Sequence, residues 1–321
     1  MTRVPLQVSL LLAVSCSASA FAQTYPGKPI TIIVPFSVGT PQDLLSRSAG
    51  KAMGEHMATS VIVDNRPGAS GSIGNSMGGK AAPDGYTLLM TSTSFIINKA
   101  VSPTLPYEPL KYTPIALLAT GDMGLVVSSE TPVHGVPDFV SLAKSSPGKL
   151  TYASPGNGTP QHLGMELFKL ESGIDVLHIP YRDNAGAVTA IVAGQSNAMM
   201  SPVFGQMLSQ IRAGKVKLIA VLTSDRVPTM PAVPTFKEAG FPNVGVHVWY
   251  GLLGPAGLPT AIVSRLSSEI NMALKQPGVR DVFEKQGLNM VGGSAERFAE
   301  WMRSEALRWA RVVKEAGIKA D

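Results

Sequence analysis

The chain has 321 residues, a formal charge of +5 and one cysteine, Cys16. Its Lys and Arg residues are scattered rather than grouped, which argues against a nucleic-acid partner. A chain of this length exceeds what one core usually organises, so two lobes are expected.

The first 22 residues predict a signal peptide. Arg3 gives a basic start, residues 8–14 are apolar, and Ala-Phe-Ala at 20–22 is a typical cleavage site. A lipoprotein is the competing interpretation, with residues 13–16 as a poor lipobox. Cleavage would remove the only cysteine, so the mature chain should lack disulfides and cysteine-bound metal. We therefore expect an exported, soluble protein whose mature chain begins at residue 23.

The first predicted strand, residues 30–35, runs through a turn with Gly and Pro into a helix. The first N–H groups of a helix are unpaired and its dipole is positive there, so this turn can bind an anion. Asp43 has a second interpretation as a helix cap, since Asp is common at that position. The candidate ligand-binding residues here are Phe36, Ser37, Val38, Gly39, Thr40 and Asp43.

Apolar runs alternate with amphipathic patterns along the rest of the chain. This alternation predicts an α/β fold built from parallel β-α-β units. The expected strands are 30–35, 60–64, 87–91, 113–119, 125–128, 150–153, 175–180, 197–201, 217–223 and 246–254. The expected helices are 43–56, 71–81, 136–145, 160–172, 184–193, 204–212, 235–239, 260–275, 278–286 and 294–316.

Two segments are expected to cross between lobes: residues 119–125 and the Pro-rich stretch 225–243. Lobe 1 would then comprise residues 23–124 and 244–321, and lobe 2 residues 125–243. A chain that crosses twice leaves a hinge and a cleft that can close on a ligand.

A second strand, Gly-containing loop and helix occur at residues 150–172. Open α/β sheets bind ligands at strand C-terminal ends, and Gly and hydroxyl side chains suit a carboxylate. We expect a structural role for the histidine of this loop. An Arg at another strand end pairs either with a ligand carboxylate or with a surface acid. The further candidates are Ser154, Gly156, Asn157, Gly158, Thr159, His162, Thr93, Tyr181, Arg182 and Asp183.

Enzyme motifs are missing from the sequence. The five histidines lack zinc-site spacing, and neither a G-x-S-x-G elbow nor a phosphate-loop motif is present. The glycines of 68–74 lack the dinucleotide spacing, so neither a cofactor nor a metal is expected. The rival class is an exported hydrolase built on Ser37 or Ser154, for which His162 is the nearby base in sequence.

At these loops the chain resembles the Bug family of periplasmic solute-binding proteins, the receptors of tripartite tricarboxylate transporters. The resemblance includes Val-Asp-Asn-Arg-Pro-Gly-Ala at 63–69 and Pro-Asp-Gly-Tyr-Thr-Leu-Leu at 83–89. Many matched segments in the same order make it specific. The other matched segments are 25–30, 34–36, 146–150, 162–168, 178–181, 234–240 and 249–257.

The resemblance implies a non-enzymatic, two-lobed, Venus-flytrap receptor of the type II-like architecture. It implies that residues 36–40 and 154–159 hold a ligand carboxylate, and that membrane permease subunits are partners. A receptor that serves a signalling protein is the alternative. The chain has Thr40 where the family usually has a second Gly, and Asp183 where Gly is usual. An acid facing the cleft would favour an amino acid or hydroxy acid; aromatic acids are further candidates.

Overall fold

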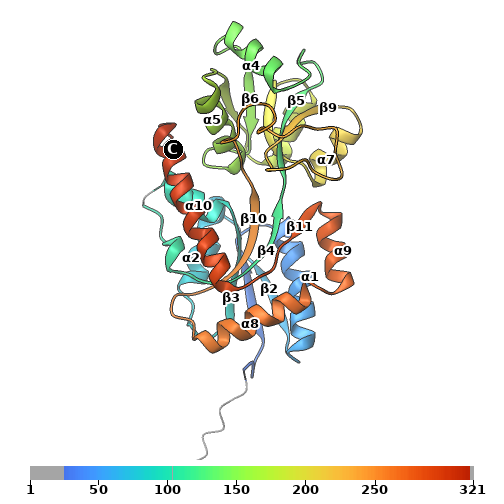
Figure 1. The fold of residues 1–321 in the computed structure, drawn as a ribbon. Coiled ribbons are helices and arrows are strands. Elements are labelled where there is room, and N and C mark those ends of the chain that lie inside the picture. Colours follow the sequence, from blue (N-terminus) through green and yellow to red (C-terminus); the bar gives the residue numbers. More distant parts are fainter. Residues whose placement is uncertain (1–24, 103, 319–321) are drawn as a thin grey trace, which may run out of the picture.

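The computed structural model describes residues 25–102 and 104–318. The expected signal peptide lies outside these residues. Figure 1 shows two α/β lobes, one above the other, joined by extended segments. Each lobe contains its own sheet, with helices packed around it.

The lower lobe in Figure 1 contains a six-stranded sheet in the order β11-β4-β10-β3-β1-β2. Strands β1, β2 and β3 are parallel, and β10 pairs antiparallel with both β3 and β4. The strands are β1 (Ile30–Val34), β2 (Val61–Asn65), β3 (Thr87–Ser92), β4 (Thr113–Gly121), β10 (Val248–Gly254) and β11 (Leu288–Met290). The α-helices are α1 (Pro41–His56), α2 (Ser72–Gly79), α3 (Ser94–Val101), α8 (Thr260–Ala273), α9 (Pro277–Lys285) and α10 (Ala295–Glu315), with 3-10 turns η1 (Ala69–Gly71) and η2 (Pro109–Lys111).

The upper lobe contains a five-stranded sheet in the order β7-β6-β8-β5-β9. Strand β6 is parallel to β7 and β8, and β5 is antiparallel to β8 and β9. The strands are β5 (Met123–Ser128), β6 (Thr151–Ser154), β7 (Leu177–Pro180), β8 (Ala198–Pro202) and β9 (Val216–Val221). The helices are α4 (Val136–Ser145), α5 (Pro160–Ser172), α6 (Asn184–Val192) and α7 (Gly205–Arg212).

The two sheets follow one plan. In each sheet, one strand enters from the other lobe: β10 in the lower sheet and β5 in the upper. This strand lies between two neighbours that run toward the lobe junction, and it pairs antiparallel with both. An arriving strand starts at the junction and must run away from it. The expectation of parallel units is therefore right within each lobe and wrong at the crossings. Strands β1 and β6 take equivalent places.

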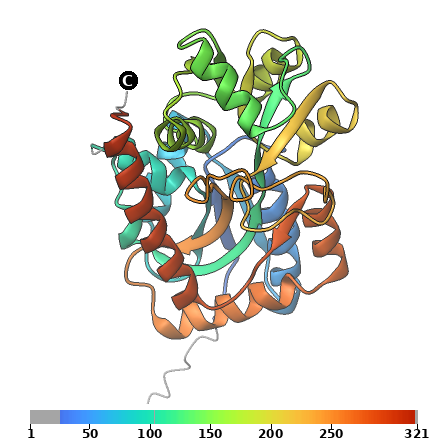
Figure 2. The same cartoon turned by 45° about the horizontal axis from the view of Figure 1, so that its top comes forward.

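Residue Asp122 alone separates β4 from β5, so the first crossing is nearly continuous strand. The return from β9 to β10 passes through residues 222–247, and helix α10 then runs along the molecule, contacting α3 and also α5 of the upper lobe (Figures 1 and 2). The exact lobe boundaries expected from the sequence stay a prediction.

The hydrophobic core of the lower lobe is centred on β10. Trp249 is fully buried and packs edge-to-face on Phe298 of α10, with ring centroids 5.6 Å apart. Gly251 provides the room, because a Cβ there would collide with the ring of Phe298. The aromatic pair thus fixes α10 on the strand that returns from the upper lobe.

Three elements differ from the expectation. Residues 235–239 form a turn and not a helix: the Glu238 carboxylate accepts the Thr235 N–H at 2.7 Å, and Gly240, at φ +92°, ends the turn. Helix α3 lies where no helix was expected, because it follows β3 with only Thr93 between them. Strand β11 has three residues, too few for a periodic signal.

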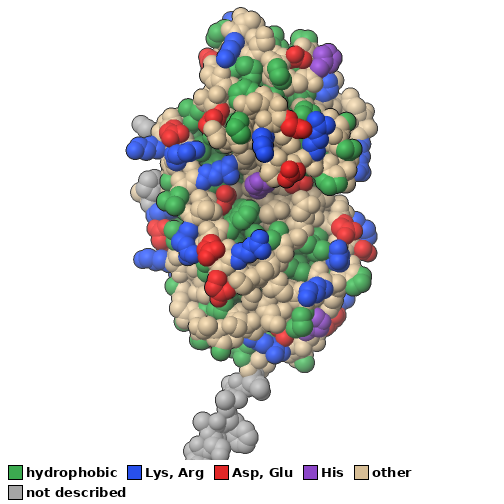
Figure 3. All heavy atoms as spheres, in the orientation of Figure 1, with side chains coloured by type: hydrophobic (Ala, Val, Ile, Leu, Met, Phe, Trp, Pro, Cys, Tyr) green, Lys and Arg blue, Asp and Glu red, His purple; other side chains and the backbone are tan. Residues whose placement is uncertain are grey.

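Among the helices of the described residues, none has both the length and the apolar character required to cross a bilayer. On the face shown in Figure 3, basic and acidic side chains are interspersed over both lobes. This agrees with the scattered charges in the sequence and offers no broad basic surface to a nucleic acid on that face.

Candidate ligand-binding site

The turns that follow β1 and β6 share one tetrapeptide. Residues 39–42 and 158–161 both read Gly-Thr-Pro-Gln, and each leads into a helix, α1 or α5. Since β1 and β6 occupy equivalent places in the two sheets, the lobes present equivalent turns. The sequence analysis found the two loops similar but did not identify this equivalence.

The backbone of the two turns is also alike. The Gly has φ +82° in the first turn and +71° in the second, and the Thr is the helix N-cap with φ −71° and −81°. In both turns the Thr hydroxyl donates to the carbonyl three residues earlier, at 2.8 Å. The Pro that follows suits the first helical position, where no N–H partner is required.

A side chain from the first turn of each helix fixes the Gly. The Gly39 N–H donates to Oδ2 of Asp43 at 2.9 Å, and the Gly158 N–H donates to Nδ1 of His162 at 3.1 Å. Both acceptors lie four residues after the Gly. These contacts favour structural roles for Asp43 and His162, which hold the turns in shape.

Asp43 is an ionised, buried acceptor. Burial acts to raise its pKa, but hydrogen bonds from Arg47, from the Gly39 N–H and with Asn65 outweigh it, so the pKa lies below the ordinary carboxyl value. The Arg47 Nε contact is 3.0 Å. Asn65 in turn donates to the Phe36 carbonyl at 3.0 Å, which ties the turn to β2.

In the upper lobe, aromatic rings support the turn. The rings of Tyr152 and His162 both stack against His178, with centroids 4.7 and 4.3 Å away. His178 Nε2 lies 2.6 Å from the Ser154 hydroxyl, which also accepts the Gly156 N–H at 3.1 Å. Ser154 is fully buried. Its hydroxyl therefore stabilises the loop through hydrogen bonds on the buried side.

A cavity of about 320 Å³ lies between the lobes at the second turn. A Cβ on Gly158 would lie 3.3 Å from Val101 of α3, so this Gly allows the lobes to approach closely. The upper lobe contributes Pro155, Gly156, Asn157, Gly158 and Thr159, and the lower lobe Ala69, Ser72, Asn98, Val101, Ser102 and Leu105.

The first turn lies beside this cavity and does not line it. Phe36 packs against Gly71, which separates two lining residues, Ala69 and Ser72. Ser37 and Val38 are exposed, and neither backbone N–H donates to any of the residues that the structure describes. Their two N–H groups precede α1 and are not used within the described chain, and the role of Ser37 and Val38 in ligand binding stays a prediction.

Each of the remaining candidate residues either forms hydrogen bonds within the protein or is exposed on its surface. Thr93 is fully buried; its hydroxyl accepts the Trp249 N–H at 2.9 Å and donates to the His247 carbonyl at 3.3 Å, which ties β3 to the returning strand. Asp183 is exposed and caps α6. Arg182 is exposed and forms no ion pair within the described part of the chain. Tyr181 donates its N–H to the Ser154 carbonyl.

Sequence reasoning missed the lower-lobe wall of the cavity. Ala69 and Ser72 lie in the Gly-rich stretch 68–74, which the sequence analysis excluded as a dinucleotide site without assigning it another role. Asn98 and Val101 belong to α3, which was not expected as a helix. The sequence signal that could have predicted this wall was a helix start directly after β3. In the structure this helix lies opposite the second Gly turn.

No three His, Cys, Asp or Glu side chains in ranges 25–102 and 104–318 converge into a set that could hold a metal ion. The donors around the cavity are backbone N–H groups, hydroxyls and amides, which suit a small organic anion better than a cation.

Comparisons with known proteins agree with this geometry. Residues 45–318 match the model of the tripartite tricarboxylate transporter family receptor. The chain is 34% identical to a UPF0065 protein encoded between tcbD and tcbE in Pseudomonas sp. strain P51, over 99% of this chain and 95% of that one. It is 32% identical to BugT of Bordetella pertussis, over 99% of both chains.

Two solved structures share the fold throughout. Rpa4515 of R. palustris with adipate has a TM-score of 0.81 at 30% identity, covering 92% of this chain and 99% of that one. MatC from Rhodopseudomonas palustris with bound malate has a TM-score of 0.78 at 30% identity, covering 90% and 100%. The match to the family model spans most of the chain, and the chain therefore belongs to the tripartite tricarboxylate transporter family of receptors, together with the Bug proteins.

Proposed function

We propose that this protein is a periplasmic receptor that captures a small carboxylate-bearing ligand between its lobes. One observation carries the proposal: two equivalent Gly-Thr-Pro-Gln turns, one per lobe, each at a helix N-terminus, with an interlobe cavity at the second turn. Paired helix N-termini give a two-sided clamp for a small anion.

The open donors define how an anion would be held. The Gly39 and Gly158 N–H groups are already used within the turns. A ligand carboxylate would therefore bind the N–H groups of Ser37 and Val38 and the unpaired first N–H groups of α1. The turns contain no lysine, which favours a carboxylate over a phosphate.

The neighbours with bound adipate and malate support a dicarboxylate or hydroxy acid as the ligand class. Arg182, next to the second turn and unpaired with any described residue, is the partner we assign to a distal carboxylate. Asp183 already accepts the Gly186 N–H at 2.8 Å as a helix cap, which reduces the case for a ligand ammonium. Amino acids and aromatic acids stay among the candidates.

The remaining parts of the proposal combine expectations from the sequence with the family's transport role. A signal peptide of residues 1–22 would direct export, residues 23–124 with 244–321 would form one lobe, and residues 125–243 the other. The closed form would be recognised by membrane permease subunits of a tripartite transporter. A signalling protein that reads the same closed form is the alternative partner.

The hydrolase alternative is less well supported. The base within reach of Ser154 is His178, at 2.6 Å, and not His162. However, the Ser154 side chain is fully buried and binds the Gly156 backbone, so a substrate carbonyl cannot reach it. Ser37 is exposed but forms no hydrogen bond with a described histidine. The geometry therefore supports binding without covalent chemistry.

A thermal-shift screen of the mature protein tests the function. Mono-, di- and tricarboxylates, aromatic acids and amino acids are added at increasing concentration, and calorimetry follows each hit. A ligand that binds the folded state raises the melting temperature in proportion to the logarithm of its concentration. We expect dicarboxylates to give the largest shift and Arg182→Gln to reduce it. The absence of a shift across all classes would contradict the carboxylate receptor.

A further inference from the structure

A second cavity, of about 250 Å³, lies at the hinge and shares no lining residue with the interlobe cavity. It is lined by the segments that connect the lobes: Asp122 lies between β4 and β5, Thr223 and Ser224 follow β9, and His247 precedes β10. Its shape therefore depends on how the two lobes are placed.

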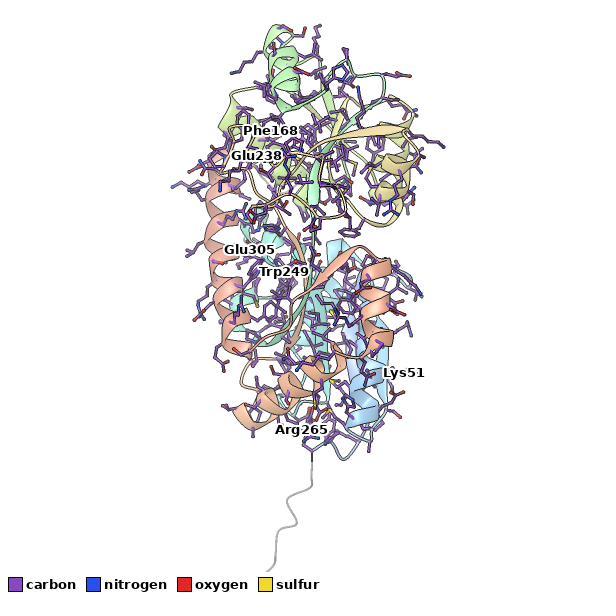
Figure 4. The ribbon with its side chains drawn as sticks, turned by 45° about the vertical axis from the view of Figure 1, so that its right-hand side comes forward. Lys51, Phe168, Glu238, Trp249, Arg265 and Glu305 are labelled. Carbon is purple, nitrogen blue, oxygen red and sulfur yellow. The ribbon has the colours of Figure 1, made fainter. Side chains whose placement is uncertain are left out.

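The walls of this hinge cavity are largely apolar. Leu117 of β4 and Phe298 and Trp301 of α10 form them. Phe298 also packs on Trp249 of β10, which Figure 4 labels, so one wall of the cavity is fixed against that strand. Apolar walls with a few polar groups are typical of small-molecule sites.

One polar group of the wall has no partner. The indole N–H of Trp301 is buried and finds no acceptor among the described residues. Buried donors in native proteins are almost always satisfied, by protein, by water or by a ligand. This N–H therefore requires an acceptor that the chain itself does not provide.

Two opposite charges line the same cavity without pairing. The Arg297 side chain is exposed and forms no ion pair with a described residue. The Asp122 carboxylate accepts a hydrogen bond from Asn289 at 3.0 Å and likewise has no cationic partner within 4.0 Å in the described chain. His247 lines the same cavity, and burial and then the charge of Arg308 lower its pKa, against the opposing effect of Asp122.

We propose that the hinge cavity binds a free α-amino acid with an apolar side chain. Its carboxylate would accept from Arg297 and from the Trp301 N–H, its ammonium would meet Asp122, and its side chain would pack on Phe298 and Leu117. An anion alone would leave Asp122 without a cationic partner, and a cation alone would leave Arg297 without an anionic partner and the indole N–H without an acceptor. A zwitterion matches all three.

The test uses the mature protein and L-phenylalanine as the probe, followed by calorimetry and by Trp fluorescence, which Trp301 reports from the cavity wall. The matched probes are 3-phenylpropionate, which lacks the ammonium, and phenethylamine, which lacks the carboxylate. We expect L-phenylalanine to bind at least tenfold more tightly than either. Equal affinity for 3-phenylpropionate, or no binding of L-phenylalanine, would overturn the proposal.

Variants locate the binding site. Arg297→Gln, Asp122→Asn and Trp301→Phe should each weaken L-phenylalanine binding at least tenfold, with circular dichroism confirming the fold. Arg303→Gln is the matched control, an exposed Arg on the same helix that does not line the cavity. Gly173→Ala, at a position that lines neither cavity and where a Cβ meets nothing, should leave binding intact. Loss in Gly158→Ala with retention in Arg297→Gln would assign the amino acid to the interlobe cavity and overturn the hinge site.

Discussion

At the scale of single residues, Asp43 and His162 have the same structural role but use different acceptor groups, a carboxylate and an imidazole. Each accepts the N–H of the Gly four residues earlier and so fixes the turn that precedes its helix. The carboxylate of Asp43 stays ionised at physiological pH because its pKa is lowered. An imidazole accepts through Nδ1 only while that nitrogen carries no proton. The lower-lobe turn is therefore fixed by a carboxylate and the upper-lobe turn by a neutral ring nitrogen.

A substitution tests the role of His162 in the upper-lobe turn. His162→Asn keeps an acceptor near the Gly158 N–H, whereas His162→Ala removes it. We expect His162→Ala to weaken binding of the carboxylate found by screening more than His162→Asn does, because the Gly158 N–H then lacks its partner. Calorimetry gives both affinities. Equal affinities in the two variants would show that this hydrogen bond does not set the shape of the binding turn.

The close approach at Gly158 gives a second residue-scale prediction. Gly158 and Gly173 flank the same helix, α5, and both have positive φ, at +71° and +65°. Replacing either with Ala should cost about 1 kcal/mol of unfolding free energy from backbone strain. A Cβ on Gly158 also meets Val101 of the other lobe, whereas a Cβ on Gly173 meets nothing.

We therefore expect Gly158→Ala to weaken carboxylate binding while Gly173→Ala leaves it unchanged. Urea denaturation gives the stability of each variant, and calorimetry gives the affinity. Equal affinities in the two variants would mean that the lobes do not approach at Gly158 when the ligand is bound.

At the scale of elements, α10 brings a buried acid to the hinge strand. Glu305 accepts the Trp309 indole N–H at 2.9 Å, and Figure 4 shows it beside Trp249. Burial raises the pKa of Glu305, although Trp309 and Arg308 act to lower it. The folded state thus binds this proton more tightly than the unfolded chain. Stability from this group is fully present below the ordinary carboxyl pKa and is lost as pH rises through the folded value.

Glu305→Gln tests this assignment. The amide keeps an acceptor for Trp309 and carries no charge to desolvate. We expect the variant to melt at a higher temperature than the natural protein at pH 7.5 and at about the same temperature at pH 4.5. Melting curves across that range give the comparison. A variant that is less stable at pH 7.5 would show that the charge of Arg308, 3.7 Å away, outweighs burial.

Local signals in the sequence predicted some elements well and others poorly. The predicted α5, 160–172, has its observed bounds, because Pro160 opens the helix and Gly173 ends it with positive φ. Helix α3 was missed, because Thr93 alone separates it from β3. The expected helix 235–239 is a single turn, because Glu238 bonds back to Thr235 and Gly240 follows.

The sequence likewise predicted one part of the candidate site and missed another. Both turns were predicted, because each depends on a short strand, a Gly and a helix start that lie next to each other in sequence. The opposite wall of the interlobe cavity was not, because Ala69, Asn98 and Val101 reach it only through packing of η1 and α3. The equivalence of the turns became clear only from the places of β1 and β6 in their sheets.

At the scale of the whole molecule, both cavities lie where their shape depends on the relative placement of the two lobes. The interlobe cavity is lined from both lobes, and the hinge cavity by the segments that join them. If the lobes move relative to each other, occupation of one cavity changes the free energy of filling the other. Thermodynamic linkage then requires the two effects to be equal.

This linkage gives the last prediction. Saturating L-phenylalanine should change the Kd of the screened carboxylate by some factor, and saturating carboxylate should change the Kd of L-phenylalanine by the same factor. Couplings of this kind typically amount to about 5- to 150-fold. Calorimetric titrations in both orders measure the two factors. In Arg297→Gln the first factor should fall to one while the carboxylate still binds. Unchanged affinities in both orders would show that the hinge cavity keeps one shape whether the lobes are open or closed.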